Sequence, residues 1–398
     1  MKICIRRGAN EIGGSCVEVV ADNGKRILID LGMPLIDDME PDHGCMPDID
    51  YDGLSAVLIS HPHGDHYMLV PFMVKEVDIY MGEVASAIIL AANSYMKYRT
   101  IDLEKTLPIA HKKSFTIADT FKVTPYLTDH SAYDSYMFLI EADGKRILYT
   151  GDFRMHGRKA SLVQSMMSNP PKDIDVMLLE GTNIGNEKNC APESDIEMDF
   201  LQEFKNTKGL VTVQSSCQNI DRLVTVYRAA KRAGRILVLP WNMGLLSMAL
   251  KNDKIPNFKS FADVKKFITD GNPKKHEITS EKIAQKPEKY VVFLTSSIYM
   301  LLEWEGLFNK DTTYIWSLWA GYKKLPYTAG TIAKIKAYGA KIAKDIHTSG
   351  HASLSDSKQF AKSIAAKKVI VMHTKYPKQF AKEIPNGMAV KDNEWITV

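Results

Sequence analysis

The hexapeptide His-Pro-His-Gly-Asp-His at residues 61–66 constrains the fold of this chain more than any other feature. It follows the apolar run at residues 56–60, which predicts a buried strand. A loop at the end of a strand can present side chains from a rigid scaffold. The pattern predicts a two-metal site rather than a His-rich solvated loop. The spacing offers two pairs of ligands for adjacent ions: His61 with His63, and Asp65 with His66.

Further apolar runs also end at a polar side chain that can bind a metal ion. Each such residue alone is a weak signal, because an Asp after a strand is usually a turn former or helix cap. Together with the hexapeptide they predict a set of ligands at the edge of one sheet assembly. The members are Asp30 after 27–29, His130 after 123–129, Asp152 after 147–151, Glu180 after 176–179 and His373 after 369–372.

Strands and helices alternate along the chain, which predicts an α/β fold. From about residue 183 to 345 the character changes to Lys-rich helical stretches between short strands near 211–214, 235–239, 290–294 and 312–316. The segment 251–289 is rich in Lys and contains three Pro residues. We expect a solvated surface region with short helices there, with contact to nucleic acid as the less favoured alternative.

Composition sets wide bounds. The chain has 398 residues, 45% hydrophobic residues and a formal net charge of +4, which suits a soluble protein of two or three domains and allows a polyanionic substrate. The N-terminus has no apolar leader, and no apolar run reaches the length of a membrane span. The five cysteines are scattered and form no C-x-x-C pair. We therefore expect a cytoplasmic protein that does not bind a membrane.

The ligand series resembles that of the metallo-β-lactamase superfamily, whose fold is an αββα sandwich. Three further segments resemble motifs A, B and C of the β-CASP nucleases, in particular ribonuclease J: Leu179–Asn183, His347–Ser353 and Met372–Thr374. The segments Gly8–Ser15, Gln214–Arg222 and Leu294–Ser297 are also similar to ribonuclease J. The resemblance implies a metallo-β-lactamase domain over 1–182, an inserted α/β β-CASP domain over 183–345, and a return to the first domain over 346–398.

The resemblance also implies the roles of the metal ligands. His61, His63 and His130 would hold one zinc ion. Asp65, His66 and His373 would hold the second, and Asp152 would bridge both. Manganese is the alternative metal where carboxylates share the site. Asp30 would support a ligand histidine from behind.

For the reaction, the resemblance implies hydrolysis of an RNA phosphodiester by a metal-activated hydroxide, leaving a 5′-phosphate and a 3′-hydroxyl. The implied catalytic residues are Asp65, His351 as the acid, and Glu180, which orients it. The residues implied for binding a substrate phosphate are Ser349, Gly350, His351, Ala352 and Ser353. Asn219 and Arg222 are implied RNA contacts, with a structural ion pair as an equal alternative for Arg222.

Two other functions remain as alternatives. A β-CASP DNA 5′ exonuclease would carry Val at motif C, so His373 favours RNA over single-stranded DNA. A small-molecule metallohydrolase would lack motifs A and B and the insertion. Ribonuclease J typically continues with a further domain after motif C, so a homodimer is an open alternative here. Trp316 and Trp319 could stack on bases, although core packing is favoured.

Overall fold

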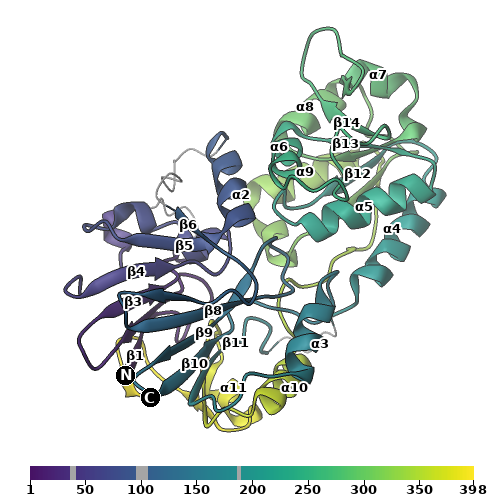
Figure 1. Cartoon of the computed structure of the whole chain (residues 1–398). Helices are drawn as coiled ribbons and strands as arrows, with labels where there is room; N and C mark the ends of the chain where they lie inside the picture. Colours follow the sequence, from purple (N-terminus) through teal and green to yellow (C-terminus); the bar gives the residue numbers. More distant parts are fainter. Residues whose placement is uncertain (36–41, 96–105, 186–189) are drawn as a thin grey trace. The chain divides into compact units, whose positions relative to one another are not determined.

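The computed structural model describes residues 1–35, 42–95, 106–185 and 190–398. The chain divides into two compact units (Figure 1). Unit 1 comprises Met1–Cys190 and Gly350–Val398, and unit 2 comprises Ala191–Ser349. The insertion predicted over residues 183–345 stays a prediction about family domains.

Unit 1 contains two seven-stranded sheets. Sheet 1 has the strand order β21-β1-β2-β3-β4-β5-β6, and sheet 2 has the order β20-β19-β11-β10-β9-β8-β7. The strands of sheet 1 are β1 (Lys2–Arg7), β2 (Cys16–Val20), β3 (Arg26–Ile29), β4 (Leu54–Leu58), β5 (Asp78–Gly82), β6 (Thr106–Ile109) and β21 (Trp395–Thr397). Those of sheet 2 are β7 (Phe115–Ile117), β8 (Phe121–Leu127), β9 (Tyr136–Ala142), β10 (Lys145–Tyr149), β11 (Val176–Glu180), β19 (Lys368–Met372) and β20 (Gly387–Ala389).

The two sheets pack face to face, and helices cover their outer faces (Figure 1). Alternate residues of β4 illustrate this: Leu58 joins the core between the sheets, whereas Val57 packs under the helices. Strands with two covered faces need continuous apolar runs, as the sequence shows. The predicted αββα sandwich is confirmed. Sheet 1 is covered by α1 (Gly64–Tyr67) and α2 (Glu83–Asn93), and sheet 2 by α3 (Ala160–Ser168), α10 (Leu354–Ile364) and α11 (Pro377–Glu383).

Parallel pairing brings the polar strand ends of unit 1 together. In sheet 1, β3 and β4 are parallel neighbours. In sheet 2, β10, β11 and β19 are parallel neighbours. The carboxyl ends of parallel strands lie at one edge of a sheet, so the residues that follow these strands meet there.

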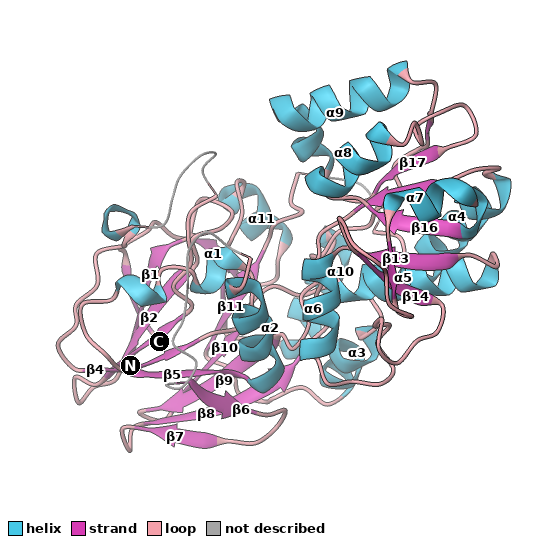
Figure 2. Cartoon of the chain, turned by 90° about the horizontal axis from the view of Figure 1, so that it is seen from above, coloured by secondary structure: helices cyan, strands magenta, loops and turns pink. Residues whose placement is uncertain are grey.

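Unit 2 is built on a seven-stranded parallel sheet of order β15-β14-β13-β16-β12-β17-β18. Helices follow the strands on both faces (Figure 2). The strands are β12 (Val211–Gln214), β13 (Ile236–Leu239), β14 (Val264–Phe267), β15 (Glu277–Ile278), β16 (Tyr290–Phe293), β17 (Thr313–Trp316) and β18 (Lys341–Ile342). The helices are α4 (Glu193–Asn206), α5 (Ile220–Arg232), α6 (Trp241–Ala249), α7 (Ser280–Gln285), α8 (Ser296–Trp304) and α9 (Pro326–Ala337).

The strand order of unit 2 has a switch point between β12 and β16. From β12 the chain passes through α5 to β13, whereas from β16 it passes through α8 to β17 on the opposite side. Neighbouring strands whose connections leave in opposite directions open a crevice at their carboxyl ends, where open α/β sheets bind ligands.

The structure differs from the sequence expectations in one region. The segment 251–289 was expected to be surface with short helices, but it contributes β14 and β15 to the sheet as well as α7. The sequence also predicts a helix over about 84–98; α2 covers this range as far as Asn93, and residues 96–98 lie outside the described residues. No helix in the described part of the chain is long and apolar enough to cross a membrane.

Candidate metal centre and active site

The carboxyl edge of unit 1 brings together the seven side chains that the resemblance implies as metal ligands. The described residues contain three overlapping groups in which one ligand atom per side chain lies within 4.8 Å of all the others. The groups are His61, His63, His130 and Asp152; Asp65, His66 and His373; and Asp152, Glu180, His351 and His373.

The first group has the geometry of side chains that converge on one ion. The ring nitrogens His63 Nδ1 and His130 Nε2 are 3.2 Å apart, and His61 Nε2 is 3.7 Å from Asp152 Oδ2. On the outer sides of two rings, His61 Nδ1 lies 3.0 Å from Ser60 Oγ and His130 Nδ1 lies 2.6 Å from the Gly350 carbonyl oxygen. These partners leave the Nε2 atoms facing the group, which is how histidines are oriented toward metals.

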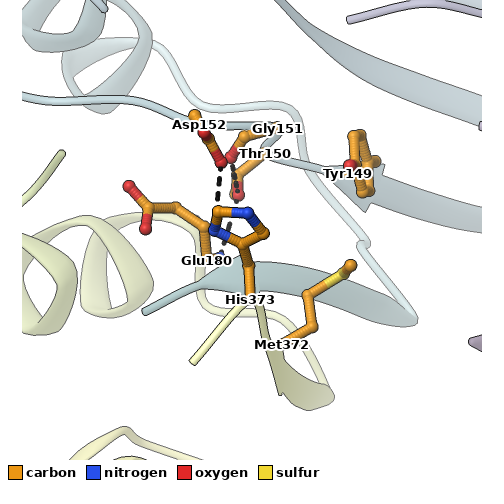
Figure 3. A pocket seen from close by; sticks show the side chains of 7 residues that line it. All are labelled: Tyr149, Thr150, Gly151, Asp152, Glu180, Met372 and His373. Atoms are coloured by element: carbon orange, nitrogen blue, oxygen red, sulfur yellow. Dashed lines mark hydrogen bonds and ion pairs between the residues drawn. The ribbon is translucent and has the colours of Figure 1, made fainter. Parts of the chain in front are cut away.

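Asp152 of the first group also lies next to the histidines of the second group. Asp152 Oδ2 lies 3.3 Å from His66 Nε2, and Asp152 Oδ1 lies 3.5 Å from His373 Nδ1. Asp65 Oδ2 lies 3.5 Å from His373 Nε2 and 3.8 Å from His66 Nε2. Figure 3 shows Asp152 facing the ring of His373, with Glu180 beside them. Asp152 is therefore placed to serve both groups.

His373 has a hydrogen-bond partner outside the groups of candidate ligands at each of its ring nitrogens. Its Nε2 accepts a hydrogen bond from the Gly13 amide at 2.9 Å, and its Nδ1 lies 2.8 Å from Thr182 Oγ1. A metal ion bound through Nε2 would have to displace the Gly13 contact. Its backbone is also unusual, with φ of 52°. Left-handed conformations of non-glycine residues concentrate at functional sites.

Buried polar atoms provide the test of whether a cation fits here. Within the described residues, His61 Nε2, His66 Nε2 and Asp152 Oδ1 are buried and lack a hydrogen-bond partner. A buried polar atom without a partner is costly, so such atoms are rare in native proteins. Imidazole and carboxylate donors are the ligands that first-row divalent cations prefer. The residues present therefore fit a divalent metal ion.

Asp30 links the two sheets of unit 1 and also contacts His66. Its Oδ1 accepts from the Ser60 amide, and its Oδ2 accepts from Ser60 Oγ, the Tyr149 hydroxyl and His66 Nδ1, each at 2.7 Å. Tyr149 belongs to sheet 2, whereas Asp30 follows β3 of sheet 1. These contacts are compatible with the predicted role of Asp30 in supporting a ligand histidine. The backbone of Asp30 is left-handed, with φ of 57°, which directs the side chain toward His66.

Burial is the largest influence on the pKa values of the first three imidazoles. It lowers the pKa of His61 and His130 well below the usual range, and it lowers the pKa of His63 to about 4. Neighbouring imidazoles lower all three further. These rings are therefore neutral at pH 7, and the neutral imidazole is the form that binds metals.

The acidic side chains dominate the other half of the site. Burial lowers the pKa of His66, but Asp152, Asp65 and Asp30 together raise it well above its usual range. Burial raises the pKa of Asp65, but His66 and His373 lower it to about 2. This half thus holds negative charge at neutral pH that a cation can balance.

His351 and Glu180 form a pair at the rim of the cluster. The distance from His351 Nδ1 to Glu180 Oε1 is 3.3 Å, and Asp152 Oδ2 lies at 3.7 Å. Glu180 is itself held, because its Oε2 accepts from the Thr182 amide at 2.9 Å. Burial lowers the pKa of His351, but the two carboxylates raise it to about 9. The ring is therefore protonated at pH 7.

The segment that carries His351 is fixed by close packing. A Cβ at Gly350 would lie 2.6 Å from Ser131 Oγ, so only glycine fits without a shift. Asn183 Nδ2 donates to the carbonyl oxygens of His351 at 2.8 Å and Ala352 at 3.2 Å. Ser353 begins α10 as an N-cap in a capping box, with its hydroxyl accepting from the Asp356 amide. Ser349 is the last residue of unit 2 in the division by compactness.

The two residues predicted to contact RNA lie in unit 2. Arg222 is completely buried and forms an ion pair with Glu193 at 3.1 Å. It also donates to Ser317 Oγ and to the Ile346 carbonyl oxygen. Asn219 is the N-cap of α5 and accepts from the Arg222 amide. RNA contact by either residue stays a prediction, and the burial of Arg222 favours the structural alternative.

Sequence reasoning missed the residues that orient the ligands. Ser60, Tyr149, Thr182 and Asn183 each make a hydrogen bond to a site residue or its backbone. All four lie at or within three residues of a strand end. Their position near a strand end could have indicated a role in the site. However, hydroxyl and amide side chains are too common at strand ends for these four residues to be identified from sequence.

Three comparisons with known proteins agree with this geometry. The family model described as a beta-lactamase superfamily domain matches residues 25–210. A crystal structure of a protein of unknown function from Enterococcus faecalis V583 superposes with a TM-score of 0.81 at 17% identity, covering 100% of this chain and 99% of that one. At this identity the likeness shows the fold alone.

Curated relatives include an RNase J-like protein of Methanocaldococcus jannaschii, 29% identical over 58% of this chain and 52% of its own length. Ribonuclease J of Helicobacter pylori strain B128 is 22% identical over 94% of this chain and 56% of its own length. Cleavage and polyadenylation specificity factor subunit 3 of Dictyostelium discoideum is 30% identical over 44% of this chain and 24% of its own length. The chain spans about half the length of the ribonuclease J relatives it matches.

The fold, the ligand series and the relatives point the same way. The αββα sandwich carries the expected ligands at the carboxyl edge of its parallel strands, and the family model covers β3 through β11. Residues 25–210 therefore match a beta-lactamase superfamily domain, and the chain is similar to ribonuclease J and to cleavage and polyadenylation specificity factor subunit 3.

Proposed function

We propose that the protein is a metal-dependent ribonuclease that hydrolyses RNA phosphodiester bonds and leaves a 5′-phosphate and a 3′-hydroxyl. The observation that carries the proposal is the meeting of seven metal-ligand candidates with the His351–Glu180 pair at one edge of unit 1. The names of the relatives, ribonuclease J among them, support RNA as the substrate. By the same likeness, the proposed activity is that of a 5′-to-3′ exonuclease, an endonuclease, or both.

Two zinc ions are the cofactor we propose, with manganese as the alternative. His61, His63, His130 and Asp152 would hold one ion, and Asp65, His66, His373 and Asp152 the other. Ligand atoms of a tetrahedral zinc site lie about 3.3 Å apart, because each bond is about 2.0–2.1 Å long. The observed separations of 3.2–3.8 Å between facing donor atoms support that choice. When bound, the two ions would activate water and offset negative charge on the phosphate.

His351 is the proton donor in this proposal. Its Nδ1 faces Glu180, so its Nε2 is the atom available to a leaving 3′-oxygen. A group with a pKa of about 9 carries its proton at pH 7 and can release it to a strongly basic oxygen in the transition state. Glu180 orients the ring and stabilises its charge through the same contact.

We further propose that the segment Ser349–Ser353 binds a phosphate of the substrate. It combines small side chains with the N-terminus of α10, an 11-residue helix. Amide groups at a helix N-terminus favour an anion. The Gly350 carbonyl already fixes His130, so a phosphate held by this segment would lie near the metal ligands.

The test is digestion of three end-labelled substrates of one sequence by the zinc-loaded full chain. The substrates are 5′-monophosphate RNA, 5′-hydroxyl RNA and single-stranded DNA. We expect cleavage of RNA by the intact chain and none by the variant with both Asp65→Ala and His66→Ala. A His276→Gln variant is the matched control, because His276 lies in unit 2 and belongs to none of the groups of candidate ligands.

Each alternative has its own outcome in this experiment. Mononucleotides released from 5′-monophosphate RNA support a 5′ exonuclease, and discrete fragments support an endonuclease. Preferential cleavage of DNA would replace the RNA assignment with a DNA exonuclease. No cleavage of any substrate by fully metal-loaded protein would overturn the nuclease proposal and favour a small-molecule metallohydrolase.

A further inference from the structure

Unit 2 carries exposed aromatic side chains on the segment that follows β17. Trp319 is 61% exposed, Tyr322 46% and Tyr327 62%. These residues lie on the short 3₁₀ helix η5 (Ala320–Lys324), its flanking residue and the first turn of α9. We call these three side chains the aromatic ledge. Large aromatic side chains are usually buried, so three within nine residues on one surface segment indicate a binding role.

The ring of Trp319 is held in place rather than free to fold away. The rings of Trp319 and Tyr322 pack edge to face with their centroids 5.4 Å apart. A Cβ at Gly321 would lie 2.1 Å from the Trp319 ring, so the indole lies directly against the glycine backbone. Trp316, the last residue of β17, is by contrast buried in the core of unit 2. The expectation of core packing thus holds for Trp316 but not for Trp319.

The charge around the ledge fits a polyanion. From residue 312 to residue 344 the sequence contains six Lys residues and no Asp or Glu. Two of the six are paired, Lys323 with Asp345 and Lys341 with Glu203. Lys324, between the ledge residues, is exposed. Aromatic rings interleaved with lysines are typical of surfaces that bind single-stranded nucleic acid, where bases stack and lysines follow the phosphates.

The ledge borders the switch point of the unit 2 sheet. A small recess there is lined by Gln214 at the end of β12, by Thr295 and Ser296 after β16, and by Tyr327 and Thr328 of α9. Tyr327 therefore belongs both to the ledge and to the recess. Carboxyl ends at a switch point are where open α/β sheets take ligands, so the ledge lies where this fold provides a binding edge.

We propose that the aromatic ledge is a stacking site for bases of single-stranded RNA, with Trp319 as its central ring. Because the occupant is RNA, this inference rests on the function proposed above. The ledge would hold the strand through its bases, independently of sequence, since every base presents a π-face. A protein partner is the other conceivable occupant, but it gives no reason for a 33-residue stretch with lysines and no acid.

The test measures RNA binding by the full chain carrying Asp65→Ala and His66→Ala, so that no cleavage interferes. Affinity for a single-stranded RNA 12-mer is read by fluorescence anisotropy, with and without Trp319→Ala. We expect a loss of about 5- to 100-fold, the effect of removing one stacked base. Trp304→Ala is the matched control, because Trp304 is 88% exposed in the same unit but ends α8, at the opposite edge of the sheet.

A second substrate separates stacking from charge. A 12-mer with abasic ribose at every position keeps its phosphates but offers no rings, so we expect Trp319→Ala to leave its affinity unchanged. Equal losses of affinity for the normal and the abasic 12-mer on Trp319→Ala would overturn the proposal. So would equal losses of affinity for the normal 12-mer in Trp319→Ala and Trp304→Ala.

The failure of the ledge and the failure of the ribonuclease proposal give different results. If metal-loaded protein cuts RNA but Trp319→Ala binds RNA normally, the ledge proposal is wrong and the ribonuclease proposal stands. If the protein cuts no RNA but binds it through Trp319, the reverse holds. In the cleaving protein, Trp319→Ala is expected to raise KM and leave kcat unchanged.

Discussion

The edge of unit 1 that carries the candidate metal ligands and the edge of unit 2 that carries the proposed stacking site differ in the side chains that they present. Both lie at the carboxyl ends of parallel strands. In unit 1 the edge gathers buried imidazoles and carboxylates, and all the groups of close metal-binding side chains among the described residues are there. In unit 2 the edge presents hydroxyl groups and exposed rings. In both units the carboxyl ends of the strands bring side chains together. Whether those side chains are buried or exposed then determines whether the edge suits metal binding or the binding of a nucleic acid.

The largest effect is expected from replacing Asp152, the carboxylate proposed to bind both metal ions at the edge of unit 1. Asp152→Ala should reduce RNA cleavage by about 10⁴-fold or more, the scale of losing a central catalytic group. It should also lower the metal content of the purified protein, because Asp152 faces donor atoms of both groups. Metal content by mass spectrometry and cleavage rate are the measurements. Asp52→Ala, an exposed aspartate, is the control; full metal content in Asp152→Ala would contradict the shared-ligand role.

The second effect concerns the interior of unit 2. Arg222→Ala removes the ion pair with the buried Glu193 and should cost about 3–5 kcal/mol of folding free energy, measured by denaturant unfolding. Arg228→Ala is the matched control, since Arg228 is 56% exposed in its pair with Glu197 and should cost at most about 1 kcal/mol. Unchanged stability together with weaker RNA binding would instead favour the predicted RNA contact.

The third prediction tests whether Asp30 supports the candidate metal ligand His66. Asp30→Asn should weaken metal binding by about 10- to 100-fold, because an amide cannot accept from His66, Tyr149 and Ser60 in the same way. Competition with a chromogenic chelator measures this affinity. Asp134→Asn is the control, a carboxylate that accepts from the Val84 and Ala85 amides, away from the ligands. An equal loss of metal affinity in both variants would show general destabilisation.

The smallest effect concerns the helix that follows motif B. Ser353→Ala should lower the free energy of unfolding by about 1 kcal/mol, because the N-cap contact with the Asp356 amide is lost. Thermal unfolding measures the change. Ser355→Ala, at an exposed position inside the same helix, should leave stability unchanged or slightly raise it. A neutral Ser353→Ala would mean that α10 does not depend on its cap.

The sequence could predict many of the site candidates because they lie at, or within three residues of, the end of a strand whose two faces are covered. Asp30, Asp152, Glu180 and His373 all end continuous apolar runs, and parallel pairing then brings them together without further information. The supporting contacts could not be predicted in the same way. Tyr149 reaches Asp30 from the other sheet, so its role depends on how the sheets pack.

The failures in unit 2 have a similar origin. The Lys-rich segment hides β14, whose sequence Val-Lys-Lys-Phe has only its two end residues buried, because the strand lies next to the edge of the sheet. Arg222 looks like a surface residue in sequence, and only the fold reveals Glu193, 29 residues earlier, as its buried partner. In both cases the environment of a charged residue is decided by a distant segment.

The four hydrogen bonds of Asp30 have an evolutionary consequence. This carboxylate joins two sheets and orients the candidate ligand His66 at the same time, so a change there would affect folding as well as the proposed metal binding. A descendant that had abandoned catalysis would still be under selection to keep it. Finding aspartate at this position in a distant homologue would therefore attest to inherited architecture, and it would say little about whether that homologue is still an enzyme.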